Sequence, residues 1–302
     1  MLIILEQVAI LLLFCVIGFI LAKKNILKPE KGDLLSGMLV YVFMPATCFS
    51  TCAANCTVEY ITVKYPLILV SAGVLLLIII AARFLAKLFG PPCYLRDMFE
   101  YSLIIPNTAY IGYPLVLALY GSEGLLDQLI FGLPLILYCY TIGYNILTGR
   151  RNEKFSLKKV LTPVTIAMLL GCAVGLSGFK VPSVITQVVD KSAACLAPLG
   201  TLLMGMSISE YPFKTMLSDK RLYWLTALRL VVIPLAVYGI LKLGRWEFAI
   251  LPAICSYAMP CGMNVIIFPK LIGQDCHSGA GMVLISTILS VITIPIMMFF
   301  LT

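Results

Sequence analysis

Residues 104–114 read IIPNTAYIGYP, and this stretch decides the fold because it interrupts a membrane-spanning segment from within. It carries two prolines, a glycine, an asparagine and a threonine inside a run that is otherwise hydrophobic enough to lie in a membrane. Proline removes a helical hydrogen bond, and the hydrocarbon core offers no water to replace that bond. We therefore expect the groups freed by the break to be satisfied by another part of the protein.

The composition around this stretch is typical of an integral membrane protein. Of the 302 residues, 61% are hydrophobic and only 12% are charged, and the mean hydropathy is +1.03. The apolar runs suit helices that cross a core roughly 30 Å thick, and they are too long for the strands of an outer-membrane barrel. The sequence therefore predicts an all-α bundle of ten transmembrane helices, at approximately 2–22, 34–53, 63–88, 97–121, 124–147, 158–178, 184–208, 219–243, 247–272 and 277–301.

The net charge of +8 comes from Lys and Arg spread over short loops, not from one basic face with interleaved aromatic residues, so nucleic acid is not expected as a partner. Cytoplasmic loops are enriched in Lys and Arg. Sixteen of the 22 Lys and Arg fall on one side of the predicted helices and five on the other, with Arg229 inside a helix. This asymmetry predicts a multi-pass protein of the cell (plasma or inner) membrane, surrounded by lipid, with both termini outside and the loop 148–159 in the cytoplasm.

The prolines indicate an internal repeat. Pro45 and Pro106 lie in the second and fourth runs of the first half, and Pro198 and Pro260 lie in the matching runs of the second half, at offsets of 198 − 45 = 153 and 260 − 106 = 154. Five helices is an odd number, so the second copy must enter the membrane from the opposite face, as in many secondary transporters. We expect a first repeat at 1–147 (helices 1–5), a linker at 148–159 and a second, inverted repeat at 160–302 (helices 6–10).

The two fourth-position helices break at matching depths. Inversion brings the breaks together near the midplane, where each offers N–H groups with a partial positive charge, a suitable site for a carboxylate. An asparagine follows each central proline and supplies a donor and an acceptor without the cost of a buried charge. A single such break could be structural, with the asparagine as a cap, but a matched pair favours a cavity. The expected substrate-binding residues are Pro106, Asn107, Thr108, Gly112, Pro260, Gly262, Met263 and Asn264.

The stretch that opens on Ile104 resembles the fourth-helix N-T-x-x-x-G-x-P-L pattern of the auxin efflux carrier family, which includes bacterial malate and malonate permeases and is related to the PIN-type auxin carriers. Residues 41–50, 196–209 and 256–268 resemble its other motifs, and the resemblance spans the whole chain. It implies a five-plus-five inverted repeat like that of sodium/bile-acid symporters, with helices 4 and 9 crossing at their prolines and one bundle moving past a static scaffold. Cys261, Gly262 and Met263 depart from the small residues common in relatives, which would alter the pocket volume.

Together these features predict a gradient-driven carrier of small organic anions, either mono- or dicarboxylates such as malate, malonate or auxin-like acids. No nucleotide-binding loop or catalytic constellation is present, so neither an enzyme nor a cofactor is expected. Coupling to H⁺ or Na⁺ and a homodimer stay open. The alternative is a membrane sensor or binding protein that keeps the fold without net transport.

Three further features stay open at this point. Arg229 lies about 15 Å deep in the eighth run, where it would be either a counter-charge for an anion or a structural partner of a carboxylate or of helix-end carbonyls. Pro45 and Pro198 are secondary candidates near the site. Cys52 and Cys56 sit four residues apart and could form a disulfide.

Overall fold

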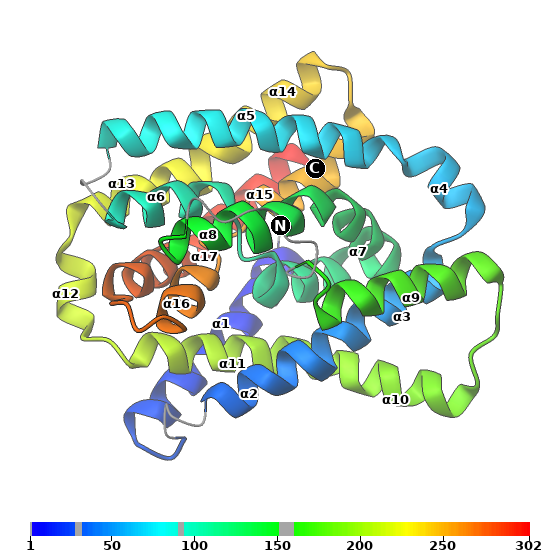
Figure 1. Ribbon diagram of the computed structural model, residues 1–302, viewed down its shortest axis with the longest axis horizontal. Helices are drawn as coiled ribbons and strands as arrows, with labels where there is room; N and C mark the ends of the chain where they lie inside the picture. The colour runs from blue at the N-terminus through cyan, green and yellow to red at the C-terminus, as the bar shows by residue number, and fades with distance from the viewer. Residues whose placement is uncertain (1, 28–31, 90–93, 151–159) are drawn as a thin grey trace.

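The computed structural model describes residues 2–27, 32–89, 94–150 and 160–302, and these residues form helices joined by short connections (Figure 1). Within these ranges the only strand-like pairing is one isolated bridge between Pro106 and Cys261. The prediction of an all-α, multi-pass membrane protein is confirmed, because seven helical segments are long and apolar enough to cross a bilayer. Most of the predicted linker falls in 151–159, outside the described residues.

The helices are, in chain order, α1 (Leu2–Lys23), α2 (Gly32–Met38), η2 (Leu39–Phe43), α3 (Met44–Asn55), α4 (Val58–Lys64), α5 (Pro66–Phe89), α6 (Tyr94–Ile104), η3 (Thr108–Gly112), α7 (Tyr113–Tyr138), η4 (Cys139–Gly143), α8 (Tyr144–Leu147), α9 (Pro163–Ser177), α10 (Ser183–Ala194), α11 (Leu196–Ser209), α12 (Phe213–Ser218), α13 (Lys220–Ala227), η6 (Leu228–Val232), α14 (Ile233–Leu243), η7 (Glu247–Ala249), α15 (Ile250–Tyr257), α16 (Asn264–Lys270) and α17 (His277–Leu301).

One apolar segment, Thr108–Leu147, is 40 residues long. A straight helix of that length would extend for roughly 60 Å, about twice the thickness of the hydrocarbon core. Gly121 divides it, because its φ of 67° and ψ of −168° are not helical. The predicted boundary between the fourth and fifth runs falls at this glycine.

Four turns, η2, η3, η4 and η6, have π-helical hydrogen bonding. Three of them end two residues before a proline: Pro45, Pro114 and Pro234. A proline inside a helix lacks the N–H donor and its ring crowds the carbonyl four residues back, so the ladder shifts by one residue. Pro45 therefore lies in the first turn of α3, and Pro198 lies likewise in the first turn of α11.

Glycines bring two pairs of helices into backbone contact. A Cβ on Gly18 of α1 would overlap the Leu202 carbonyl oxygen of α11, and one on Gly205 of α11 would overlap the Cys15 carbonyl oxygen of α1. A Cβ on Gly171 of α9 would lie 2.7 Å from the Phe49 carbonyl oxygen of α3. Small residues allow this approach in membrane bundles, and they fasten α1 to α11 and α9 to α3.

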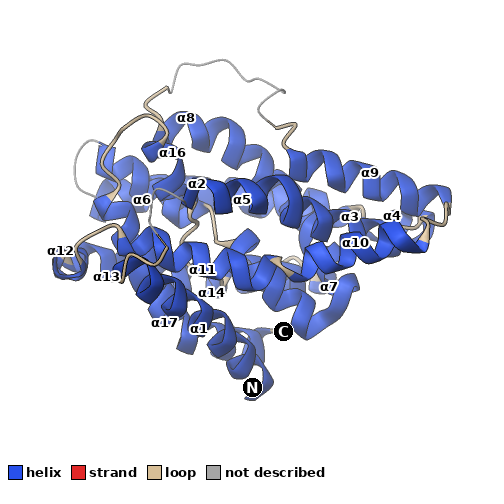
Figure 2. Ribbon diagram, turned by 90° about the horizontal axis from the view of Figure 1, so that it is seen from below, coloured by secondary structure: helices blue, strands red, loops and turns tan. Residues whose placement is uncertain are grey.

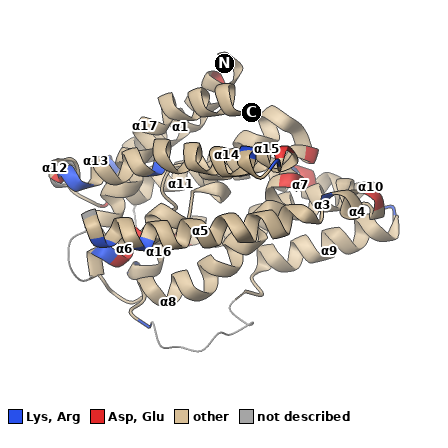
Figure 3. Cartoon of the chain, turned by 90° about the horizontal axis from the view of Figure 1, so that it is seen from above, with Lys and Arg blue, Asp and Glu red and all other residues tan. Residues whose placement is uncertain are grey.

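The remaining helices pack beside these two pairs. Figure 1 shows α2, α3, α9, α10 and α11 along one side of the molecule and α5, α13 and α14 along the other, with α6, α8, α15, α16 and α17 between them. Seen from below in Figure 2, these layers lie one in front of the other, and α1 and α17 lie toward the edge at which both ends of the chain are marked. In Figure 3 most of the charged residues gather toward the two ends of the bundle, and Arg229 is buried between them. The ion pair of Lys270 with Glu210, at 2.8 Å, joins the end of α16 to the end of α11.

Candidate functional site

Two interrupted helices meet in the middle of the bundle. The first break separates α6 from η3 at residues 105–107, and the second separates α15 from α16 at residues 258–263. The Asn107 N–H donates a hydrogen bond of 2.8 Å to the Pro260 carbonyl, and the Gly262 N–H donates one of 3.2 Å to the Ile105 carbonyl. These bonds flank the antiparallel bridge between Pro106 and Cys261. Each break thus satisfies backbone groups that the other has freed.

Gly262 permits this close approach. A Cβ there would lie 3.2 Å from both the Ile105 and the Pro106 carbonyl oxygens, which are backbone atoms with little freedom to move. The neighbouring Cys261 N–H donates to the Ser286 hydroxyl of α17 at 3.0 Å, which ties the second break to a third helix. The second break is consequently hydrogen-bonded both to the first break and to α17.

Asn107 caps the half-helix that follows the first break. Its side-chain oxygen accepts a hydrogen bond of 3.3 Å from the Tyr110 N–H, as an N-cap residue does, and its side-chain amide donates to the Met204 sulfur at 3.5 Å. A thioether is a weak acceptor. Asn107 is only 2% exposed. Its side-chain amide could donate instead to a stronger acceptor placed in the cavity.

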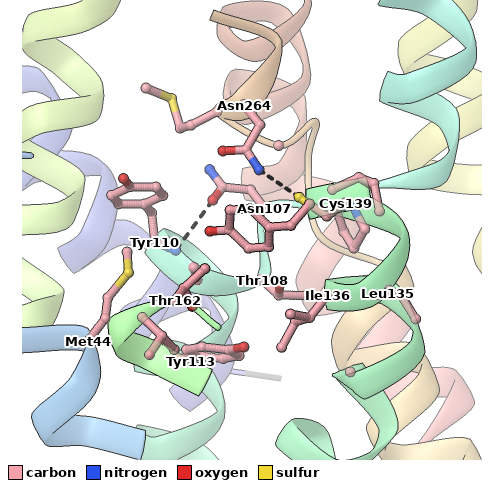
Figure 4. Close-up of a pocket in the computed structure, with 18 of the residues that line it drawn as sticks. Met44, Asn107, Thr108, Tyr110, Tyr113, Leu135, Ile136, Cys139, Thr162 and Asn264 are labelled. Atoms are coloured by element: carbon pink, nitrogen blue, oxygen red, sulfur yellow. Dashed lines mark hydrogen bonds between the residues drawn. The ribbon is translucent and has the colours of Figure 1, made fainter. Parts of the chain in front are cut away.

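Asn264 is the first residue of α16, after the second break. Its side-chain amide donates to the Tyr101 hydroxyl at 3.1 Å and to the Cys139 sulfur at 3.0 Å. Figure 4 shows Asn107 and Asn264 next to one another at the same cavity, each with its amide among the lining side chains. The structure brings together the two asparagines that the sequence paired.

The cavity beside the crossing has a volume of about 240 Å³. Its polar groups include the two asparagines and Thr108, while apolar side chains of α3, α7 and α16 make much of the remaining wall. The described residues that line it are Ser36, Val40, Met44, Ile105, Pro106, Asn107, Thr108, Ala109, Tyr110, Tyr113, Gln128, Gly132, Leu135, Ile136, Cys139, Tyr140, Thr162, Val164, Thr165, Gly262, Met263, Asn264, Ile267 and Phe268. None of these lining residues is Lys, Arg, His, Asp or Glu.

Six of the eight predicted site residues line this cavity: Pro106, Asn107, Thr108, Gly262, Met263 and Asn264. The other two lie beside it. The Pro260 carbonyl accepts the hydrogen bond from Asn107, and a Cβ on Gly112 would lie 3.1 Å from the Gln128 amide nitrogen. Pro260 and Gly112 therefore contact residues that line the cavity, Asn107 and Gln128, without lining it themselves.

The secondary candidates Pro45 and Pro198 do not line the cavity either. Met44, which precedes Pro45, does so from the first turn of α3. Cys52 and Cys56, considered as a disulfide pair, are both free thiols in the structure.

Arg229 is completely buried and holds both broken helices. Its Nε donates to the Met259 carbonyl at 3.2 Å and one terminal nitrogen donates to the Leu103 carbonyl at 2.9 Å. These carbonyls lie at the ends of α15 and α6, where helical carbonyls lack partners and carry a partial negative charge. Of the two roles open for Arg229, the structure supports that of a partner of helix-end carbonyls.

Several lining residues were not predicted from the sequence. Gln128 is 1% exposed, donates from its amide to the Cys255 carbonyl at 2.9 Å and joins α7 to α15. Tyr110, Tyr113 and Tyr140 also line the cavity. A buried glutamine in an apolar run is a signal that could have identified Gln128, whereas the tyrosines resemble ordinary core residues in the sequence.

Comparison with known proteins adds the family. Residues 3–298 match a protein family described as "Membrane transport protein". An uncharacterized transporter of Methanocaldococcus jannaschii is 25% identical over 96% of this chain and 96% of its own length. An uncharacterized transporter of Methanothermobacter thermautotrophicus is 22% identical over the same shares of both chains.

Proposed function

Because the chain belongs to the membrane transport protein family, to which the auxin efflux carriers also belong, we propose that it is a secondary transporter that moves small organic anions across the cell membrane by alternating access. The observation that carries the proposal is the crossing of two broken helices, with Asn107 and Asn264 beside one cavity. Irregular backbone at membrane depth is tolerated where protein buries it or where it lines a cavity.

The chemistry of the crossing suits an anion. The first turn of a helix leaves N–H groups without partners inside the helix, and those ends attract negative charge. The turns that begin at Thr108 and Asn264 both border the cavity. The opposite, negative ends of α6 and α15 are occupied by Arg229, so the cavity side of the crossing is the electropositive one.

The proposed architecture has ten spanning segments in two inverted halves, 1–147 and 160–302. The pairing of α1 with α11 and of α9 with α3 supports it. In this architecture α1, α3, α9 and α11 belong to the first, second, sixth and seventh segments. A two-fold axis that exchanges the first segment with the sixth also exchanges the second with the seventh. It therefore converts the α1–α11 pair into the α9–α3 pair. The same axis would exchange the two broken segments, which meet at Pro106 and Cys261.

The proposed direction of access follows from the loop charges. The cavity extends from the crossing to Ser36, Thr162 and Thr165, which follow the two Lys- and Arg-rich loops at 23–31 and 148–159. With those loops in the cytoplasm and both termini outside, this conformation takes its substrate from the cytoplasm.

The test is flux in proteoliposomes that contain the purified full-length chain. Asn107→Ala and Asn264→Ala, singly and together, are expected to reduce uptake of radiolabelled organic acids by at least about tenfold while protein levels stay unchanged. Thr186→Ala, on the exposed face of α10, is the matched control. Normal flux in the double variant would contradict the site, and ligand binding without flux would favour the sensor instead.

A further inference from the structure

Three cysteines from two helices form a thiol cluster where α3 packs against α9. The thiol of Cys172, on α9, contacts the thiols of both Cys52 and Cys56, at the end of α3. We propose that this thiol cluster is a redox site, in which Cys172 is oxidised first and then forms a disulfide with Cys52 or Cys56 that links α9 to α3. None of the three residues lines the cavity, so the inference goes beyond the proposed function and does not depend on its substrate.

Glycines of α9 hold the two helices in close contact at the thiol cluster. A Cβ on Gly171, the residue before Cys172, would lie 2.8 Å from the Cys52 Cβ. A Cβ on Gly175 would lie 2.6 Å from the Cys56 carbonyl oxygen and 2.8 Å from the Cys52 carbonyl oxygen. Because glycine stands at both positions, the side chain of Cys172 reaches α3 directly. A disulfide between the two helices therefore needs little movement of either backbone.

The expected disulfide runs between the helices because pairing within α3 is unfavourable. Cys52 and Cys56 are joined by a helical hydrogen bond of 2.9 Å from the Cys56 N–H to the Cys52 carbonyl. Residues four apart on a helix have Cβ atoms about 5–6 Å apart, whereas a disulfide joins Cβ atoms about 3.5–4.5 Å apart. Cys172 contacts both thiols, so either of them can complete the bond.

Cys172 is the member of the cluster that an oxidant reaches first. Cys52 and Cys56 are 0% exposed, whereas Cys172 is partly exposed. Cys172 also lies within roughly 8 Å of the end of α9 at Ser177. In the proposed orientation, with the loop 148–159 in the cytoplasm, this end of α9 faces outside. Disulfides persist on that side of a cell membrane, whereas the cytosol keeps thiols reduced.

A small neutral peroxide, hydrogen peroxide, supplies the oxidising equivalents. The Cys172 thiolate attacks one peroxide oxygen and breaks the O–O bond, which gives a sulfenic acid on Cys172 and a hydroxide that takes up a proton as water. The sulfur of Cys52 or Cys56 then attacks the Cys172 sulfur and breaks its S–O bond. The S–S bond forms, and the departing hydroxide takes the thiol proton as a second water. Two thiols lose two electrons, and one peroxide is reduced to two waters.

The experiment counts and maps thiols in the purified full-length protein in proteoliposomes. The protein is treated with hydrogen peroxide, denatured, alkylated with N-ethylmaleimide and digested for mass spectrometry. The chain has 11 cysteines, and we expect the number of alkylated thiols to fall by two. The expected crosslinked peptide joins Cys172 to Cys52 or to Cys56. Dithiothreitol added after the peroxide is expected to restore both thiols, because it reduces a disulfide by exchange.

Variants assign the role of each thiol. In Cys172→Ser no disulfide is expected to form. Cys52→Ser and Cys56→Ser are each expected to keep the two-thiol loss, since the remaining partner completes the bond. The double variant is expected to lose one thiol and to leave Cys172 as a sulfenic acid that dimedone labels. Cys195→Ser is the matched control, because Cys195 is partly exposed and its thiol donates to the Lys191 carbonyl, and it is expected to behave like the wild type.

Three results would overturn the proposal. An unchanged thiol count in the oxidised wild type would show that the cluster is not redox-active. A disulfide between Cys52 and Cys56 would contradict the pairing between helices. A loss of two thiols in Cys172→Ser would contradict the role of Cys172 as the first residue oxidised. Should a variant fail to fold, the crosslinked peptide of the wild-type protein decides alone.

Discussion

The backbone N–H of Asn107 donates a hydrogen bond of 2.8 Å to the carbonyl of Pro260, although the two residues lie in different halves of the chain. Each residue belongs to a helix that breaks inside the membrane-spanning region. Each break supplies hydrogen-bond partners for backbone groups of the other break. The site is therefore defined by backbone contacts first, and its side chains are positioned by that backbone.

Substitution of Gly262 tests whether the backbone contact is required. In Gly262→Ala the new Cβ would lie 3.2 Å from two carbonyl oxygens of the other break, and we expect overpacking to cost about 1–3 kcal/mol and to abolish substrate binding. Gly239→Ala, in α14 with open space around it, is the control and should be neutral or stabilising. Thermal unfolding and acid binding measure both effects, and a fully active Gly262→Ala protein would refute the role of this contact.

Asn107 has two roles that a pair of variants separates. Asn107→Ala removes both the cap on Tyr110 and the amide donor, so we expect a loss of about 1 kcal/mol in stability together with the loss of anion binding. Asn107→Asp keeps an oxygen for the cap but places a negative charge at the site. We expect it to retain stability and to lose anion binding, and anion binding by Asn107→Asp would contradict the assignment. Calorimetry and thermal unfolding distinguish the two variants.

Loss of Arg229 should weaken the crossing without touching the cavity wall. Arg229→Met leaves the carbonyls of Leu103 and Met259 buried without donors, which we expect to cost about 3 kcal/mol. Arg229→Lys keeps the charge and one donor and should lose less than half of that. The free energy of unfolding in denaturant is the measurement, and equal losses in the two variants would show that the positive charge alone does not stabilise the crossing.

The Lys270–Glu210 pair links α16 to α11 at the end of the molecule. Both side chains are partly exposed, so we expect a coupling energy of only about 0.5 kcal/mol in a double-mutant cycle of Lys270→Gln and Glu210→Gln. The coupling should disappear at 1 M salt, because the screening length there is roughly 3 Å. A coupling that salt does not change would mean that the pair acts by packing and not by charge.

The fold followed from the sequence where the signals were local and periodic. The two prolines with their following asparagines predicted the broken segments, and the runs 97–121 and 247–272 contain the breaks that the structure has. The π-helical turns before Pro45, Pro114 and Pro234 were not predicted. A proline in the sequence predicts that the helical hydrogen bonds are interrupted. The hydrogen-bond pattern can then shift by one residue or the helix can end, and the packing of neighbouring helices decides which of the two occurs.

The lining of the cavity was predicted in part, for a related reason. Asn107 and Asn264 stand out because polar residues are costly in a membrane helix. Tyr110 and Phe268 line the cavity beside them, but a tyrosine or phenylalanine in an apolar run has the same appearance whether it faces lipid, a core or a ligand. Arg229 was identified from the sequence as a charge inside a helix. Its partners could not be identified, because they are backbone carbonyls, which every residue carries.

The ladder between Ile105–Asn107 and Pro260–Gly262 also constrains how the molecule is made. The first break emerges from the ribosome long before the second, and until the second arrives its carbonyl and amide must be solvated by water or by the insertion machinery. The crossing can consequently form only after the second break has been synthesised. In a chain that stops after its first half, the Asn107 N–H and the Ile105 carbonyl would have no hydrogen-bond partner from the second break. Such a chain is a natural target for quality-control proteases.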